Sequence, residues 1–193
     1  MADLSVDLGF ITLKNPVIPA SGTFGYGEEF AGLLDLDRLG AFVLKGIYED
    51  YRGGNPPPRI HETPSGILNS IGLAGPGARS LREIIRRVGR ITRTPLVVNV
   101  CGGSDEEYER VALTFDDMEE VGFLELNISC PNVHAGGACA AQDEGHTHRL
   151  VQRIRSRVRK PLMVKLSPNV PDIGRIARAA EDAGADAISL VNT

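Results

Sequence analysis

Short apolar segments alternate along the chain with segments in which apolar residues recur at helical spacing. Six segments are apolar over most of their length and predict buried strands: 17–21 (VIPAS), 41–46 (AFVLKG), 95–100 (PLVVNV), 123–130 (FLELNISC), 161–167 (PLMVKLS) and 186–193 (DAISLVNT). Strands that are apolar on both faces are typical of a parallel sheet covered by helices.

Helices are predicted between these strands by three apolar faces. The faces consist of Leu81, Ile84, Ile85, Val88 and Ile91, then Tyr108, Val111, Ala112, Phe115 and Met118, then Ile173, Ile176, Ala177 and Ala180. The first two faces follow a capping-box pattern, Ser80 with Glu83 and Ser104 with Glu107, which is typical of a helix N-terminus. The repeated βα order predicts an α/β fold with right-handed crossovers.

Two fold classes share this order, the doubly wound sheet and the (β/α)8 TIM barrel. The barrel is favoured because polar residues end several strands, and barrel strand ends converge on one mouth: Ser21, Lys45, Asn99, Asn127, Cys130, Lys165, Asn192 and Thr193. A barrel has eight strands in roughly 250 residues. We therefore expect residues 1–193 to form a single, incomplete TIM-barrel domain of about six βα units, preceded by a β-hairpin in residues 4–16.

Composition narrows the possible functions. The net charge of -4 and the pI of about 5.6 argue against a nucleic-acid binder. The three cysteines, Cys101, Cys130 and Cys139, are odd in number and form no CxxC pair, so we expect neither a disulfide framework nor a metal site. The N-terminus lacks a signal-peptide pattern and no apolar run approaches ~18 residues, so we expect a cytoplasmic protein without a membrane segment.

Lys45 and Lys165 stand inside otherwise apolar strands, where an unpaired ammonium group is costly. Each has two interpretations, an ion pair with an internal carboxylate or a contact to an anionic cofactor. For one of them a Schiff-base lysine is a third. An aldolase that uses Lys165 is the corresponding alternative function. The glycine-rich stretch that follows Ser21 would allow close approach of a planar or phosphorylated ligand, although this signal is weak by itself.

Cys130 ends a predicted strand and precedes a glycine-rich segment. A lone strand cysteine is most often a small buried hydrophobic residue. At a barrel mouth, however, its thiol would serve as a nucleophile or general base. The neighbouring Asn127 and Asn132 each offer a donor and an acceptor, which suits a neutral ring with imide and amide edges.

The basic segment 153–160 (RIRSRVRK) and the histidines have simpler explanations. Ile154 and Val158 share the predicted helix with the arginines, which favours a solvated outer helix face over an anion-binding patch. His146 and His148 are two residues apart and would not share a helix face, which disfavours a metal pair.

Five stretches of the chain resemble class 1 dihydroorotate dehydrogenases, and among these the 1B type. They are residues 15–30 (NPVIPASGTFGYGEEF), 62–73 (ETPSGILNSIGL), 127–137 (NISCPNV with HAGG), 161–170 (PLMVKLSPNV) and 183–193 (AGADAISLVNT). The NISCPN and VKLSPN pieces are specific when they occur together.

The resemblance implies an FMN-containing barrel that oxidises dihydroorotate to orotate in pyrimidine (UMP) biosynthesis. Cys130 would remove the C5 proton of the substrate while hydride leaves C6 for FMN. Substrate contacts are implied for Lys45, Asn69, Asn127, Asn132, Asn192 and Thr193, and cofactor contacts for Ser21, Lys45, Asn99, Asn127 and Lys165.

The resemblance also implies a partner subunit that carries FAD and a [2Fe-2S] cluster and passes electrons to NAD, in a heterotetramer built around a homodimer of this chain. Two alternatives stay open. Dihydropyrimidine dehydrogenases have a similar flavin barrel and cysteine, and act on dihydrouracil or dihydrothymine. A chain with fewer than eight strands is alternatively an inactive truncated fragment, since in this family the FMN phosphate lies after strands seven and eight.

Overall fold

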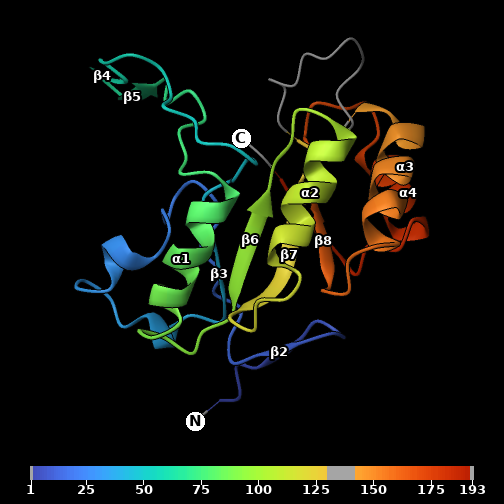
Figure 1. Ribbon diagram of the computed structural model, residues 1–193, viewed down its shortest axis with the longest axis horizontal. Coiled ribbons are helices and arrows are strands. Elements are labelled where there is room, and N and C mark those ends of the chain that lie inside the picture. Colours follow the sequence, from blue (N-terminus) through green and yellow to red (C-terminus); the bar gives the residue numbers. More distant parts are fainter. Residues whose placement is uncertain (1, 130–141, 192–193) are drawn as a thin grey trace.

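The computed structural model describes residues 2–129 and 142–191. Its centre is a parallel sheet in which spatial order follows chain order: β3 (Phe42–Val43), β6 (Leu96–Val100), β7 (Val121–Asn127), β8 (Leu162–Lys165) and β9 (Ala187–Ser189). Four helices cover one side of the sheet (Figure 1): α1 (Ala78–Val88), α2 (Asp105–Phe115), α3 (Glu144–Arg155) and α4 (Ile173–Asp182). Each of these helices is too short or too polar to span a lipid bilayer.

Successive side chains of each strand point to opposite faces of the sheet, and this divides the buried apolar side chains into two clusters. The outward residues of β6, such as Val98 and Val100, pack with the helices, as do Leu124 and Leu126 of β7. The inward residues form a separate, smaller cluster that includes Leu13, Ala41, Val43, Val97 and Phe123, with Met163 packed against it. A curled parallel sheet with helices outside and an apolar interior is the arrangement of a part of a (β/α)8 barrel.

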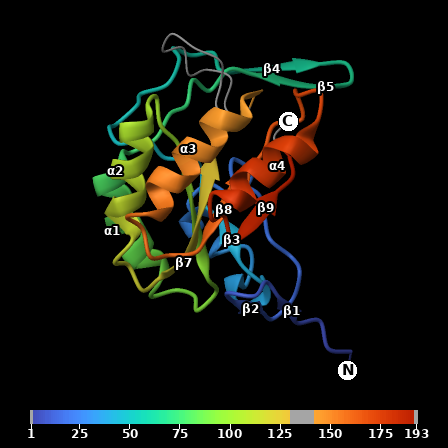
Figure 2. The ribbon, with the colours of Figure 1, turned by 90° about the vertical axis from the view of Figure 1, so that its right-hand side faces the viewer.

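Two β-hairpins lie at opposite ends of the molecule (Figures 1 and 2). The predicted N-terminal hairpin is confirmed as β1 (Val6–Asp7) and β2 (Thr12–Leu13). It lies at the end where the parallel strands begin and contributes Leu13 to the inner cluster. The hairpin of β4 (Ile60–Thr63) and β5 (Gly66–Asn69) projects beyond the ends of the strands. It forms part of the insertion between β3 and β6.

The predicted strand at 17–21 is wrong. The segment runs beside β3 and accepts hydrogen bonds at the Val17 and Pro19 carbonyl groups from the amides of Gly40 and Val43. Pro19 has no N–H to return, and the Val17 amide donates to its neighbour Asn15, so a strand ladder does not form. The other five predicted strands are confirmed with changed bounds: four are shorter than predicted, and β7 begins two residues earlier, at Val121. Residue 130 and residues 192–193, at the ends of two predicted strands, lie outside the described residues. Two short 3-10 helices, η1 (Glu28–Phe30) and η2 (Leu36–Arg38), fill the stretch before β3.

One of the two predicted capping boxes is wrong. Helix α1 begins two residues before Ser80, with Gly77 at its N-cap and no side-chain cap. Ile91 falls beyond this helix and is exposed. In contrast, Ser104 caps α2, because its hydroxyl accepts from the amide of Glu107 at 3.2 Å. The Glu107 carboxylate accepts from the amide of Gly103.

Candidate active site

Buried polar side chains replace the apolar ones one step further along the strands. Directly beyond Val97, Phe123 and Met163, the next inward positions carry Asn99, Glu125 and Lys165, which are 0%, 2% and 7% exposed. Asn127 follows on β7 and is half-buried. We call Asn99, Glu125, Asn127 and Lys165 the polar layer. It lies toward the C-terminal ends of the strands, where barrel enzymes place their active sites.

Three side chains of the polar layer form a hydrogen-bonded chain. Asn99 Nδ2 donates to Glu125 Oε2 at 2.5 Å, and Asn127 Nδ2 donates to Asn99 Oδ1 at 3.1 Å. Ser129 extends it, since its hydroxyl donates to Asn127 Oδ1 at 2.7 Å. The backbone carbonyl of Asn127 also accepts from the Tyr108 hydroxyl at 2.7 Å. The structure therefore brings together the predicted pair Asn99 and Asn127.

Glu125 and Ser129 were not predicted as site residues. Glu125 is a charged residue inside an apolar strand, which is the same signal that identified Lys165. Ser129 had no comparable signal, because serine is common at strand ends and its role depends on its neighbours in space.

Lys165 lies on the other side of the polar layer. Its Nζ donates to the Ser21 hydroxyl at 3.3 Å, which joins two predicted cofactor contacts that are 144 positions apart. Lys165 and Glu125 both line a cavity of about 300 Å³ whose other walls are largely apolar, from Ile18, Ala20, Val43, Phe123, Met163, Ile188 and Val191. No ion pair involves Lys165 among the described residues, so the internal ion-pair interpretation is not supported.

The backbone at Gly46 approaches the polar layer closely. A Cβ atom at this position would lie 2.7 Å from Asn99 Oδ1 and 2.9 Å from Cys101 Sγ. Cys101 in turn donates its thiol hydrogen to Asn99 Oδ1 at 3.5 Å. Asn99 Oδ1 thus accepts from two side chains, and only a residue without a side chain fits opposite it.

Tyr26 contributes a protonated hydroxyl near this region. Burial, together with the charges of Glu29 and Cys101, raises the pKa of Tyr26 to about 12. Its hydroxyl is buried and has no hydrogen-bond partner among the described residues. Tyr26 therefore stays neutral at physiological pH and keeps an available donor.

The other predicted site residues are less closely grouped. Lys45 follows β3 and is half-buried, with its amide bonded to the Gly25 carbonyl at 2.8 Å. Asn69 is exposed on the β4–β5 hairpin and lines a shallow cavity with Asn55 and Ser70. Four predicted site residues lie outside the described residues: Cys130, Asn132, Asn192 and Thr193.

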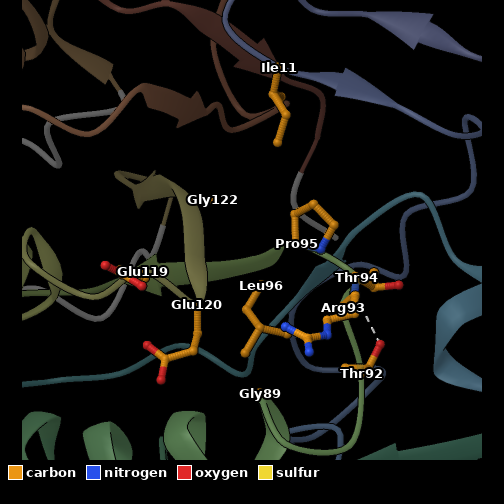
Figure 3. Close-up of a pocket in the computed structure, with 10 residues that line it drawn as sticks. All are labelled: Ile11, Gly89, Thr92, Arg93, Thr94, Pro95, Leu96, Glu119, Glu120 and Gly122. Carbon is orange, nitrogen blue, oxygen red and sulfur yellow. Dashed lines mark hydrogen bonds between the residues drawn. The ribbon is translucent and has the colours of Figure 1, made fainter.

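A second cavity, of about 530 Å³, lies at the opposite ends of the strands (Figure 3). Its walls come from the residues that precede β6 and β7, including Arg93, Pro95 and Glu120, and from Ile11 near the N-terminal hairpin. None of the predicted site residues lines it. It belongs to the end of the barrel where strands begin, which is usually concerned with stability.

The basic segment lies on the outer surface, as predicted, but α3 ends at Arg155, so Val158 does not share its helix. Arg153 pairs with Glu106 and Glu109, Arg157 also pairs with Glu109, and Arg159 pairs with Asp116. These ion pairs tie α3 and the loop after it to α2. His146 is bonded to Asp105 at 2.8 Å, and His148 contacts the Ala179 carbonyl instead.

The chain is similar to one family of known proteins over almost its whole length. A family model described as dihydroorotate dehydrogenase matches residues 3–193. Relatives from Bacteroides fragilis and Desulforudis audaxviator are both named dihydroorotate dehydrogenase B (NAD(+)), catalytic subunit. The first is 47% identical over 100% of this chain and 64% of its own length, and the second 48% identical over 98% and 62%. The chain thus spans less than two thirds of the length of these relatives.

A solved structure shares the fold. The structure of DHODH from Eimeria tenella in complex with ferulenol matches with a TM-score of 0.77, over 99% of this chain and 60% of that chain. Sequence identity is 19%, so this likeness concerns the fold alone. It confirms the predicted class, an α/β TIM barrel of which this chain contains a part.

Proposed function

Because the chain belongs to the dihydroorotate dehydrogenase family, we propose that it oxidises dihydroorotate to orotate in the de novo synthesis of pyrimidines. The observation that carries this proposal is the polar layer. Asn99, Glu125 and Lys165 are buried together beside the half-buried Asn127, at the end of the barrel interior where TIM-barrel enzymes bind their ligands. Amides suit the imide and amide edges of a dihydropyrimidine ring, because each offers both a donor and an acceptor.

The residues present fit a flavin, and we propose FMN. The Lys165 ammonium has three donors and gives one of them to Ser21, so it retains capacity toward a ligand in the adjoining cavity. The largely apolar walls of that cavity suit the body of a planar ring. Asn99 and Lys45 complete the set of proposed contacts. A bound flavin supplies the acceptor for the two electrons of the oxidation.

The chain's own residues then have distinct tasks. Cys130, as the general base, would take the proton from C5 of dihydroorotate as hydride leaves C6, and a C5–C6 double bond would form. A bound flavin would supply the acceptor for that hydride. Lys165, with its positive charge, stabilises the negative charge that develops on the electron acceptor. Asn127 holds the substrate ring, together with Lys45, Asn69, Asn132, Asn192 and Thr193. Cys130 stands three positions after Asn127 in the sequence.

The proposed assembly follows the names of the relatives, which describe a catalytic subunit of an NAD(+) enzyme. We propose that electrons leave through a separate subunit that carries FAD and a [2Fe-2S] cluster and reduces NAD. A homodimer of this chain within a heterotetramer, and a cytoplasmic location, belong to the same proposal. The three scattered cysteines of this sequence are fewer than the four that ligate a [2Fe-2S] cluster, which supports placing the cluster on the other subunit.

The first test is an anaerobic visible spectrum of the purified chain with FMN, before and after dihydroorotate. We expect a protein-bound flavin band that bleaches on addition of the substrate. The Cys130→Ala variant should bind flavin equally and bleach on the order of 100-fold or more slowly, because it lacks the base. A flavin that stays oxidised with dihydroorotate, or a chain that binds no flavin, would contradict the proposal for this chain.

Two further measurements separate the alternative functions. Faster bleaching by dihydrouracil than by dihydroorotate would favour a dihydropyrimidine dehydrogenase. Borohydride trapping with a carbonyl substrate should leave Lys165 unlabelled, whereas labelling would favour the aldolase.

A further inference from the structure

The hydrogen-bonded chain that ends at Glu125 has a direction. The Glu125 carboxyl group presents only oxygen atoms to its neighbours, and the Asn99 amide turns its Nδ2 toward one of them. This leaves Oδ1 of Asn99 facing Asn127. Asn127 must then turn its own Nδ2 toward Asn99 and its Oδ1 toward Ser129.

The position of Glu125 makes this constraint strong. Its side chain is 2% exposed and lies beyond the apolar floor of Val97 and Phe123, so water competes little for its oxygens. No ion pair involves Glu125 among the described residues. The Asn99 amide donates to Glu125 Oε2 at 2.5 Å, and a buried polar group that loses its hydrogen-bond partner is costly.

We infer that Glu125 is a positioning residue that sets the orientation of the Asn99 and Asn127 amides, and thereby which of their atoms face the ligands. This inference rests on the proposed function, in which those two amides contact flavin and substrate. An asparagine amide presents a donor on one side and an acceptor on the other. A reversed amide would place the wrong group against each edge of the ring.

The orientation can be tested without any ligand. In the full chain, the side-chain amide signals of Asn99 and Asn127 are recorded by 15N NMR after selective asparagine labelling. Glutamine has the shape of glutamate but can donate as well as accept, so in Glu125→Gln we expect both amide signals to shift or to double. The matched control is Glu109→Gln, which removes another buried carboxylate on the outer face of α2 and should leave both signals in place.

A second variant distinguishes orientation from a loss of packing. In the double variant Glu125→Gln with Asn99→Asp, the carboxylate moves from position 125 to position 99, the next residue in the hydrogen-bonded chain. The introduced aspartate would then accept from the introduced glutamine and from Asn127, and the Asn127 signal should return toward its original position. If the Asn127 signal is unaffected by Glu125→Gln, or if the double variant fails to restore it while remaining folded, the inference is wrong.

Ligand binding supplies a third measurement. We expect Glu125→Gln to weaken flavin binding, measured by fluorescence quenching, by on the order of tenfold, with Glu109→Gln unchanged. Failure of the wild-type chain to bind flavin or to bleach with dihydroorotate would contradict the proposed function. In that case the NMR signals of the two amides would still test the role of Glu125. Normal bleaching with unchanged flavin affinity in Glu125→Gln would contradict the inference alone.

Discussion

At position 46 the chain passes so close to Asn99 that the identity of one residue decides the shape of the site. In Gly46→Ala the added methyl group would meet Asn99 Oδ1 and Cys101 Sγ at less than 3 Å, so Asn99 must move. We expect the free energy of unfolding to fall by about 1–3 kcal/mol and flavin affinity to fall with it. Chemical denaturation and a flavin titration would measure the two effects.

Gly32 offers a matched control on the surface. A Cβ atom there would meet nothing within 4 Å, so Gly32→Ala should change the free energy of unfolding by less than about 0.5 kcal/mol. A Gly46→Ala protein with wild-type stability and flavin affinity would show that Asn99 does not need its described position.

The residues of the candidate site were predictable where their chemistry conflicts with their surroundings. Lys165 stands out because a lysine is rare in an apolar strand, and the structure places it beside the predicted Ser21. Glu125 is likewise a charged residue in an apolar strand, but the site prediction for that strand rests on Asn127 and Cys130. The orientation of Asn99 depends on which atoms face each other across two strands, and spacing along one strand does not contain that information.

Among the elements, α1 and α2 provide a direct test of how helices begin. Both carry a Ser-x-x-Glu pattern, but Ser104 lies at the N-cap of α2 and Ser80 lies inside α1. We expect Ser104→Ala to lower the free energy of unfolding by about 1 kcal/mol, because the Glu107 amide loses its acceptor. Thermal unfolding of the purified variants would measure this.

Ser80→Ala should not lower stability, because alanine is the better residue inside a helix. Equal losses in the two variants would show that α1 starts near Ser80 after all. The pattern alone did not distinguish the two serines. The structure does, because Gly77, with a φ of 81°, lets the chain turn into the helix before Ser80 is reached.

Elements were predictable where apolar residues follow one another almost without interruption, as in β6, β7 and β8. Prediction failed in segments rich in proline and glycine. Residues 17–21 have the composition of a strand but lack a donor at Pro19. The β4–β5 hairpin was not predicted, because its four-residue strands lie within an insertion of high polarity and are exposed throughout.

For the whole molecule, carboxylates that form ion pairs or accept hydrogen bonds predict a loss of stability in acid. The hydrogen bond from Thr92 lowers the pKa of Asp37 below 3.8, and those from Arg110 and Arg153 lower the pKa of Glu49 and Glu109 below 4.5. A carboxylate whose pKa is lower in the folded state than in the unfolded state stabilises the protein at pH values above its unfolded-state pKa. This stabilisation is lost as the pH falls through the folded-state pKa. Urea unfolding midpoints should therefore be constant from pH 7 to 5 and fall below about pH 4.5.

Glu109→Gln should reduce this acid dependence, since it removes one of the carboxylates that must be protonated. Equal midpoints at pH 5 and pH 3 in the wild-type chain would contradict the assignment. The ion pairs are partly exposed, so 1 M salt should weaken the effect.

The fold class of the whole molecule was predictable, because the repeated βα order and the polar strand ends leave few alternative fold classes. The described chain has one parallel strand fewer than predicted, and it spans 64% of the length of a relative that is 47% identical.

The sheet separates two sets of buried side chains that share no residue, and this has an evolutionary consequence. The large outer cluster between strands and helices contributes most of the buried apolar contacts, whereas the polar layer faces the other side. Under the proposed function, a substitution in the polar layer would therefore alter ligand preference without disturbing the packing of the helices. Selection can then change what the site recognises in single steps, while the helices and their contacts keep the molecule folded.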